Sequence, residues 1–135
     1  MLEIHPVRDK EKLQPLYSKH ELVFSDDCMA VFAMDGEEMI GYCLFSLGAD
    51  DISVKSLVPT DDIMLADGIL RSALHVAVEN GKVNAFYEQS APESVFKTLG
   101  FIKNVETKSL DIQKLFLSCK SHQGREAMKL QNQMA

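Results

Sequence analysis

The side chains that could do chemistry in this chain are spread along it, and they form none of the common metal or redox patterns. Its three cysteines lie far apart and include no C-x-x-C pair: Cys28, Cys43 and Cys119. We therefore expect reduced thiols, no metal site, and a buried Cys43 within a strand. Carboxylates are more concentrated, because Asp61, Asp62 and Asp67 stand at the start of the longest segment with helical periodicity. A carboxylate there either caps the helix or opposes an anionic ligand.

Around these side chains, the apolar pattern changes between period two and period 3.6, which predicts an α/β domain of the α+β kind. Strands are predicted at 2–7 (ended near Pro6), 28–34, 39–47, 52–58 and 82–88, with a further strand of about ten residues from Phe101. Helices are predicted at 9–20, at 61–81 and between Ala91 and Gly100, with a helical turn within 111–119. Asp9 is expected to cap the first helix, and Asn80-Gly81 is expected to stop the long one. The three successive strands within 28–58 predict an antiparallel meander.

Three local sequences match one protein family in their order and spacing. Met39-Ile40-Gly41-Tyr42 is similar to its third strand, and Ser56-Leu57-Val58-Pro59 is similar to its fourth strand and the turn that follows. The segment 95–101 is similar to the family's L-Y-x-K-L-G-F segment. With the order of the predicted elements, these matches make residues 1–110 resemble the GNAT acetyltransferases. The resemblance implies a mixed, mostly antiparallel central sheet flanked by helices, in a GNAT-like domain at 1–118. Residues 119–135 are polar, and we expect a C-terminal tail that is helical or disordered.

In a protein of that family, the strand that ends at Val58 would separate from its neighbour, and acyl-coenzyme A would lie between them. The resemblance thus implies acetyl-CoA as the co-substrate and direct attack on its thioester by the amine of a small molecule or peptide. The diphosphate would lie at the N-terminus of the long helix, where exposed N–H groups and the helix dipole favour an anion. The residues implied to bind the cofactor are Leu57, Val58, Met64, Leu65, Ala66, Asp67, Gly68 and Gln89.

The diphosphate loop departs from the family pattern R/Q-x-x-G-x-G/A. The Arg or Gln falls at or near Asp62. The first glycine becomes Met64 or Leu65, and Gly68 is displaced. Two unit charges ~4 Å apart repel by ~1 kcal/mol in water, whereas the helix dipole contributes only ~0.3–1 kcal/mol. We therefore expect weaker affinity for coenzyme A than in a standard member, or simple helix capping by Asp61 and Asp62.

The expected proton donor is also missing. Phe96 stands where the family often has a tyrosine that protonates the departing thiolate, and phenylalanine cannot donate a proton. Tyr87 is the nearest substitute in sequence and the one catalytic candidate, although a tyrosine at a strand end needs no catalytic role. No general base stands out, because the carboxylates near predicted strand ends are also typical of a solvated surface: Glu38, Asp51 and Glu88. His75 lies on the long helix, where a satisfied or exposed histidine is the simpler interpretation.

The charge balance bears on partners. Fourteen basic and twenty acidic residues give a net charge of -6, which argues against a nucleic-acid-binding surface. No apolar run reaches the ~20 residues that span a bilayer, and the first residues do not resemble a secretory signal, so we expect a cytoplasmic chain without a membrane partner. Two alternatives stay open: a GNAT-like domain that is catalytically inactive and binds a ligand or protein, and a homodimer in which the tail packs on a neighbouring copy.

Overall fold

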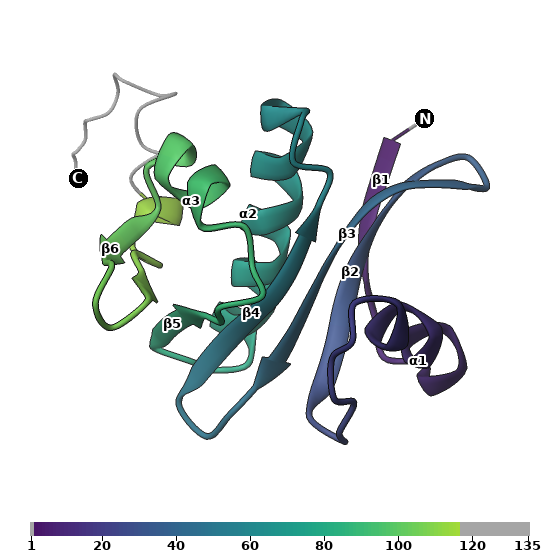
Figure 1. Cartoon of the computed structure of the whole chain (residues 1–135), viewed down its shortest axis with the longest axis horizontal. Helices are drawn as coiled ribbons and strands as arrows, with labels where there is room; N and C mark the ends of the chain where they lie inside the picture. The colour runs from purple at the N-terminus through teal and green to yellow at the C-terminus, as the bar shows by residue number, and fades with distance from the viewer. Residues whose placement is uncertain (1, 117–135) are drawn as a thin grey trace, which may run out of the picture.

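Seven strands form one sheet in the order β1-β2-β3-β4-β5-β7-β6, with helices on both faces (Figure 1). The computed structural model describes residues 2–116. In chain order, its elements are β1 (Leu2–Val7), α1 (Lys10–Lys19), β2 (Cys28–Asp35), β3 (Glu38–Leu47), β4 (Asp51–Val58), α2 (Ile63–Glu79), β5 (Asn84–Tyr87), α3 (Glu93–Leu99), β6 (Ile102–Asn104) and β7 (Ser109–Leu110). All neighbouring strands are antiparallel except β4 and β5. The predicted fold class, a mixed and mostly antiparallel sheet flanked by helices, is confirmed.

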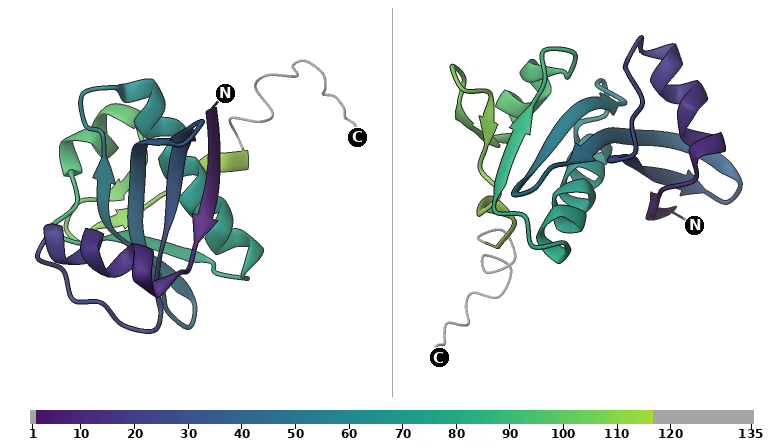
Figure 2. Two further views of the ribbon diagram at one scale, coloured as in Figure 1. Left: turned by 90° about the vertical axis from the view of Figure 1, so that its right-hand side faces the viewer. Right: turned by 90° about the horizontal axis from the view of Figure 1, so that it is seen from below.

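Two apolar layers hold the sheet between α1 and α2, which lie on its opposite faces (Figure 2). The apolar stripe of α2, with Ile69 and Leu70 fully buried, packs on one face. On the other face, Leu13 and Tyr17 of α1 pack on β2 and β3. The Tyr17 hydroxyl donates to the carbonyl oxygens of Met29 and Phe45 at 2.8 and 2.9 Å, which ties α1 to the middle of the sheet. Burial therefore decides which side of each strand faces which helix.

The predicted helix caps are confirmed. The Asp9 carboxylate accepts from the N–H of Glu11 at 3.0 Å, just before α1. Asn80 caps the end of α2, and Gly81 follows it with a φ of 76°, in the left-handed region that glycine adopts without strain. Within residues 2–116, no helix is long and apolar enough to cross a membrane. The predicted tail at 119–135, and Cys119 with it, lie outside the described residues.

Strand β1 spans Leu2–Val7, so the predicted strand that ends near Pro6 is confirmed, with Pro6 itself inside the paired part. Pro6 lies opposite Val31, and Val7 lies opposite Ala30. A proline lacks the N–H that a central strand needs on both sides. Because β1 is at the edge of the sheet, only one of its sides pairs with a strand, and a proline is tolerated.

The strand predicted to run for about ten residues from Phe101 is instead a hairpin of two short strands, β6 and β7. The turn between them is held by the side chain of Asn104, whose Oδ1 accepts from the N–H groups of Glu106 and Thr107 at 2.8 and 3.2 Å. Lys108 completes the turn with a φ of 53°. The segment contains neither glycine nor proline, so the usual sequence signals of a turn are absent.

Replacing Gly68 with alanine is expected to stabilise the protein by about 0.5–1 kcal/mol, because a glycine inside a helix loses more backbone entropy on folding than alanine does. Gly68 lies within α2, and a Cβ added there would meet only Cδ1 of Ile4, at an ordinary contact distance of 3.7 Å. Urea unfolding of the two proteins would measure the difference. A loss of stability would mean that the space beside Ile4 is tighter than this geometry indicates.

Candidate functional site

Strand β4 pairs with β5 along only half of its length. The parallel pairing runs from Asp51, opposite Asn84, to Val54, opposite Tyr87. One more hydrogen bond, from the N–H of Glu88 to the carbonyl of Val54 at 2.8 Å, closes the paired part. On its other side, β4 stays paired with β3 up to Val58. The two parallel strands therefore separate after Val54, as the resemblance to the GNAT family implied (Figure 1).

Polar side chains bridge the point of separation. A bulge in β4 leaves Lys55 without a partner in β3, since Val54 lies opposite Phe45 and Ser56 lies opposite Leu44. The Lys55 ammonium group contacts the Glu88 carboxylate at 2.7 Å, and the Ser90 hydroxyl donates to the Lys55 carbonyl at 2.8 Å.

The unpaired edge of β4 is thus short, from Ser56 to Val58. The side chain of Leu57 is buried in the core on the α2 face, whereas Val58 packs against the layer beneath α1. Within residues 2–116, no strand pairs with this edge. The implied role of Leu57 and Val58 thus rests on their backbone groups, as the family resemblance requires.

The N-terminal tip of α2 carries both a cap and free donors. Asp62 is the N-cap, and its carboxylate accepts from the N–H of Leu65 at 3.1 Å. The capping interpretation of Asp62 is confirmed. Among the described residues, nothing accepts a hydrogen bond from the N–H groups of Ile63 and Met64. The tip can therefore offer the N–H groups of Ile63 and Met64 to an anion, whereas the N–H of Leu65 is already bonded to the Asp62 carboxylate.

The other predicted loop residues lie in different surroundings. Met64 is 86% exposed, whereas Leu65 is half-buried and packs against the main core. Ala66 is fully buried, so it contributes to packing. Asp67 forms an ion pair with Arg71, whose Nε lies 2.9 and 3.0 Å from the two carboxylate oxygens.

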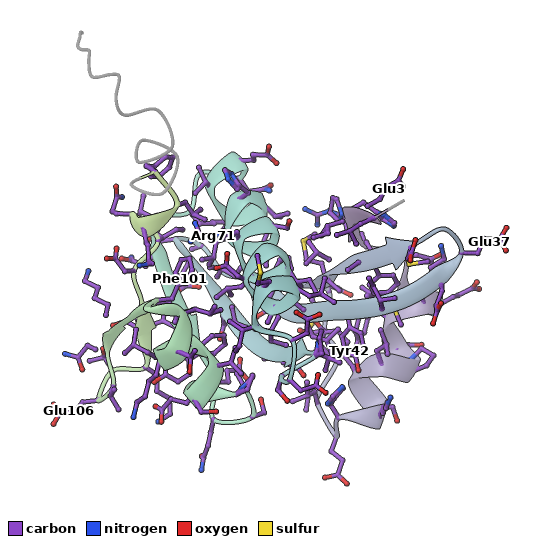
Figure 3. The ribbon with its side chains drawn as sticks, turned by 90° about the horizontal axis from the view of Figure 1, so that it is seen from above. Glu3, Glu37, Tyr42, Arg71, Phe101 and Glu106 are labelled. Carbon is purple, nitrogen blue, oxygen red and sulfur yellow. The ribbon has the colours of Figure 1, made fainter. Side chains whose placement is uncertain are left out.

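The ion pair of Asp67 is itself anchored. The Arg71 guanidinium lies over the Phe101 ring, 5.1 Å from its centroid, and Figure 3 shows the two side by side. The negative charge of Asp67 is therefore balanced along α2. Asp61 and Asp62 are left as the acidic groups of the tip.

Gly41 brings β3, β4 and α2 together at this site. A Cβ on Gly41 would lie 2.6 Å from Cδ1 of Ile69, 2.7 Å from the carbonyl oxygen of Val58 and 3.0 Å from Cδ of Pro59. These distances are well below a normal contact. The glycine in the Met39–Tyr42 match therefore lets the end of β4 lie close to the start of α2.

The predicted acid, Tyr87, is buried, and its hydroxyl donates to the Glu93 carboxylate. Burial and the Glu93 carboxylate raise the pKa of Tyr87 to about 12, so the phenol keeps its proton at neutral pH. Its ring packs on Phe96, which is fully buried as a core residue. Because the hydroxyl is directed at Glu93, proton donation to a thiolate would require that bond to exchange, and the catalytic role of Tyr87 stays a prediction.

Gln89 is exposed and lines a cavity of about 80 Å³ together with Tyr87, Glu93 and Lys108. The carbonyl of Lys108 accepts from the N–H of Tyr87 at 2.9 Å, so this cavity lies on the β7 side of β5. Contact between Gln89 and a ligand on β4 stays a prediction.

Two polar features on the α1 face of the sheet were not predicted from the sequence. Nε2 of His20, the C-cap of α1, lies 2.7 Å from the Tyr42 hydroxyl. Tyr42 and Val58 are direct partners across β3 and β4. Ser56 is buried on the same face, opposite Leu44. The segment around His20 carries no recognisable motif. Strand register places Tyr42 and Ser56 on one face, and the packing of α1 on that face brings His20 to Tyr42.

No family model and no curated protein matches the sequence. The fold, in contrast, is similar to that of solved acetyltransferases. A ribosomal-protein-alanine N-acetyltransferase from Brucella melitensis biovar Abortus 2308 aligns with a TM-score of 0.55 at 14% identity, over 74% of this chain and 89% of that one. For the ribosomal-protein-S18-alanine N-acetyltransferase from Escherichia coli, the TM-score is 0.53 at 9% identity, over 81% and 88%. A GNAT-family acetyltransferase from Streptococcus pneumoniae TIGR4 gives 0.53 at 15% identity, over 76% and 88%. With its half-paired β4 leading to the tip of α2, this chain has the fold of the GNAT acetyltransferases.

Proposed function

We propose that this chain is an acyl-CoA-dependent N-acyltransferase that transfers an acetyl group from acetyl-CoA to an amine. One observation carries the proposal. The edge of β4 from Ser56 to Val58 has no strand partner within residues 2–116, and it leads directly to the N-terminal tip of α2. An unpaired strand edge supplies backbone donors and acceptors to an extended ligand, and a helix tip supplies donors to an anion.

The two parts suit the two halves of coenzyme A. The pantetheine arm carries amides, which pair with backbone groups as a strand would. The diphosphate is an anion, for which the N–H groups of Ile63 and Met64 are free among the described residues. The proposed reaction places the thioester beside Val58, where the amine attacks the carbonyl carbon. The contribution of the protein is then mainly to position the two reactants.

The amine is that of a small molecule or peptide, and three probes cover both classes: spermidine, free lysine and a peptide that begins with alanine. The two described cysteines, Cys28 and Cys43, are both free and buried. This is consistent with the reducing cytoplasm as the place of action.

A second candidate is a GNAT-like domain that binds a ligand or protein without catalysis. The capped tip favours it, because the Asp62 carboxylate lies where the diphosphate would bind. The fully buried Phe96 favours it too, since the expected proton donor is absent there.

Calorimetric titration with acetyl-CoA, followed by thiol release with the three amines, distinguishes the two candidates. The proposal expects a binding heat and release of free coenzyme A with at least one amine. Binding without release would favour the non-catalytic domain. If millimolar acetyl-CoA produced neither a binding heat nor a shift in thermal stability, the acyltransferase would be excluded.

A further inference from the structure

Apart from tyrosines and cysteines, Ser56 is the one buried residue with a polar side chain among residues 2–116, and 6% of its surface is exposed. In the described part of the chain its hydroxyl has no hydrogen-bond partner. Buried hydroxyls are nearly always paired, and leaving one unpaired is unfavourable. An unpaired hydroxyl on the free edge of β4 therefore points to a ligand group that bonds it in the working protein.

The side chain of Ser56 lies on the α1 face of the sheet. Its direct partner across the strands, Leu44, belongs to the apolar layer beneath α1, and so does Tyr42. Tyr42 lies opposite Val58, two residues beyond Ser56. Ser56 and Tyr42 are thus diagonal neighbours on one face, a spacing of ~7–8 Å that an aromatic side chain can reach across. Figure 3 places Tyr42 between the sheet and α1.

The Tyr42 hydroxyl is hydrogen-bonded to an imidazole. Among the described residues its partner is Nε2 of His20, at 2.7 Å. In the imidazole tautomer that carries its proton on Nδ1, the hydroxyl donates and Nε2 accepts. Burial lowers the pKa of His20, with a smaller effect from the charge of Lys19, and burial raises the pKa of Tyr42. Both groups are therefore neutral at neutral pH, which leaves the imidazole able to take a proton and the phenol able to pass one on.

We propose that Ser56 and the Tyr42–His20 pair receive the amine of the acceptor on the α1 face of β4 and take its proton during acyl transfer. This inference rests on the proposed function. Ser56 accepts a hydrogen bond from the amine and holds its nitrogen beside Val58. Tyr42 receives the proton, and His20 is the group that finally carries it.

The amine nitrogen forms a C–N bond to the thioester carbonyl carbon, and the C–S bond breaks with its electron pair going to sulfur. The nitrogen loses a proton to the oxygen of Tyr42 while the proton of Tyr42 moves to Nε2 of His20. The half-buried imidazolium then releases its proton to water, and the thiolate of coenzyme A takes a proton from water. No oxidant, reductant or metal takes part.

The experiment compares Ser56→Ala, Tyr42→Phe and His20→Ala with the wild type, using the amine that the wild type acetylates fastest among spermidine, lysine and the alanine peptide. Removing a general base typically lowers turnover by ~10²–10⁴-fold. We expect a fall of about 100-fold for Tyr42→Phe and His20→Ala, and about tenfold for Ser56→Ala, with acetyl-CoA affinity unchanged in all three. Added imidazole should restore part of the turnover of His20→Ala.

Stability separates this role from a structural one. Ser56→Ala removes an unpaired buried hydroxyl, so its thermal midpoint should equal or exceed that of the wild type while its turnover falls. Ser46→Ala is the matched control. Ser46 lies in β3 on the same face of the sheet as Ser56, but it is opposite Ser53, where β4 is still paired with β5. It should keep wild-type turnover.

The outcomes are distinct. If the wild type transfers acetyl groups and Ser56→Ala and Tyr42→Phe transfer them equally fast, this inference is overturned and the proposed function stands. In that case the hydrogen-bond partner of the Ser56 hydroxyl would be an ordered water and not the acceptor amine. If His20→Ala is slow but imidazole does not restore it, the proton route through His20 is overturned. If the wild type neither binds acetyl-CoA nor transfers, both proposals fall together.

Discussion

Asparagine in place of Asp62 is expected to strengthen acetyl-CoA binding by about five- to tenfold at low salt. Asp62 caps α2 beside the two free N–H groups of its tip, so its carboxylate lies next to the proposed diphosphate site. Asparagine caps a helix about as well as aspartate does and carries no charge. The repulsion is therefore removed while the cap is kept, and only the small interaction of the carboxylate with the helix dipole is lost.

Calorimetric titration of Asp62→Asn and the wild type with acetyl-CoA would measure this gain. Asp9→Asn is the matched control, because Asp9 caps α1 in the same way and the substitution removes the same charge. It should leave the affinity nearly unchanged. The gain from Asp62→Asn should shrink as salt is added, since ions screen exposed charges beyond ~10 Å at 0.1 M. Equal affinities of Asp62→Asn and the wild type at low salt would place the diphosphate away from the tip of α2.

Alanine in place of Gly41 is expected to destabilise the protein by about 1–3 kcal/mol, the usual range for an overpacked core. The added Cβ would lie 2.6 Å from the buried Cδ1 of Ile69 and 2.7 Å from the backbone oxygen of Val58. The Ile69 side chain has little room to move, because it is fully buried. The end of β4 must shift instead, and with it the edge that the proposed function uses.

Urea unfolding would measure the loss, and titration with acetyl-CoA below the unfolding transition would test the shift of β4. Affinity should fall in Gly41→Ala even where the protein is folded. Gly68→Ala provides the comparison with the same chemical change, and its expected effect on stability has the opposite sign. If both variants were equally stable, the contact of Gly41 with Val58 would not be a tight one.

The sequence and the structure agree most closely where local patterns decide the conformation. The 3.6-residue pattern of Ile69, Leu70 and their neighbours predicted α2, and the caps at Asp9 and Asp62 were read correctly, because a cap acts on its own first turn. The β2–β4 meander was predicted from strand lengths and the turns between them. The hairpin turn after Asn104 was missed, since a turn that is held by a side-chain cap and contains neither glycine nor proline leaves no clear signal in the sequence.

The sequence by itself determined the element order and the three local matches, which indicated the GNAT fold. It also determined the two departures from the family pattern, the acidic start of α2 and the replacement of tyrosine by Phe96. Only the tertiary structure decided that β4 leaves β5 after Val54, that Arg71 balances Asp67, and that Ser56, Tyr42 and His20 share one face beside Val58. The physical reason is that strand register and burial join residues far apart in the chain. A pattern of period two tells which residues alternate but not which partner each one meets.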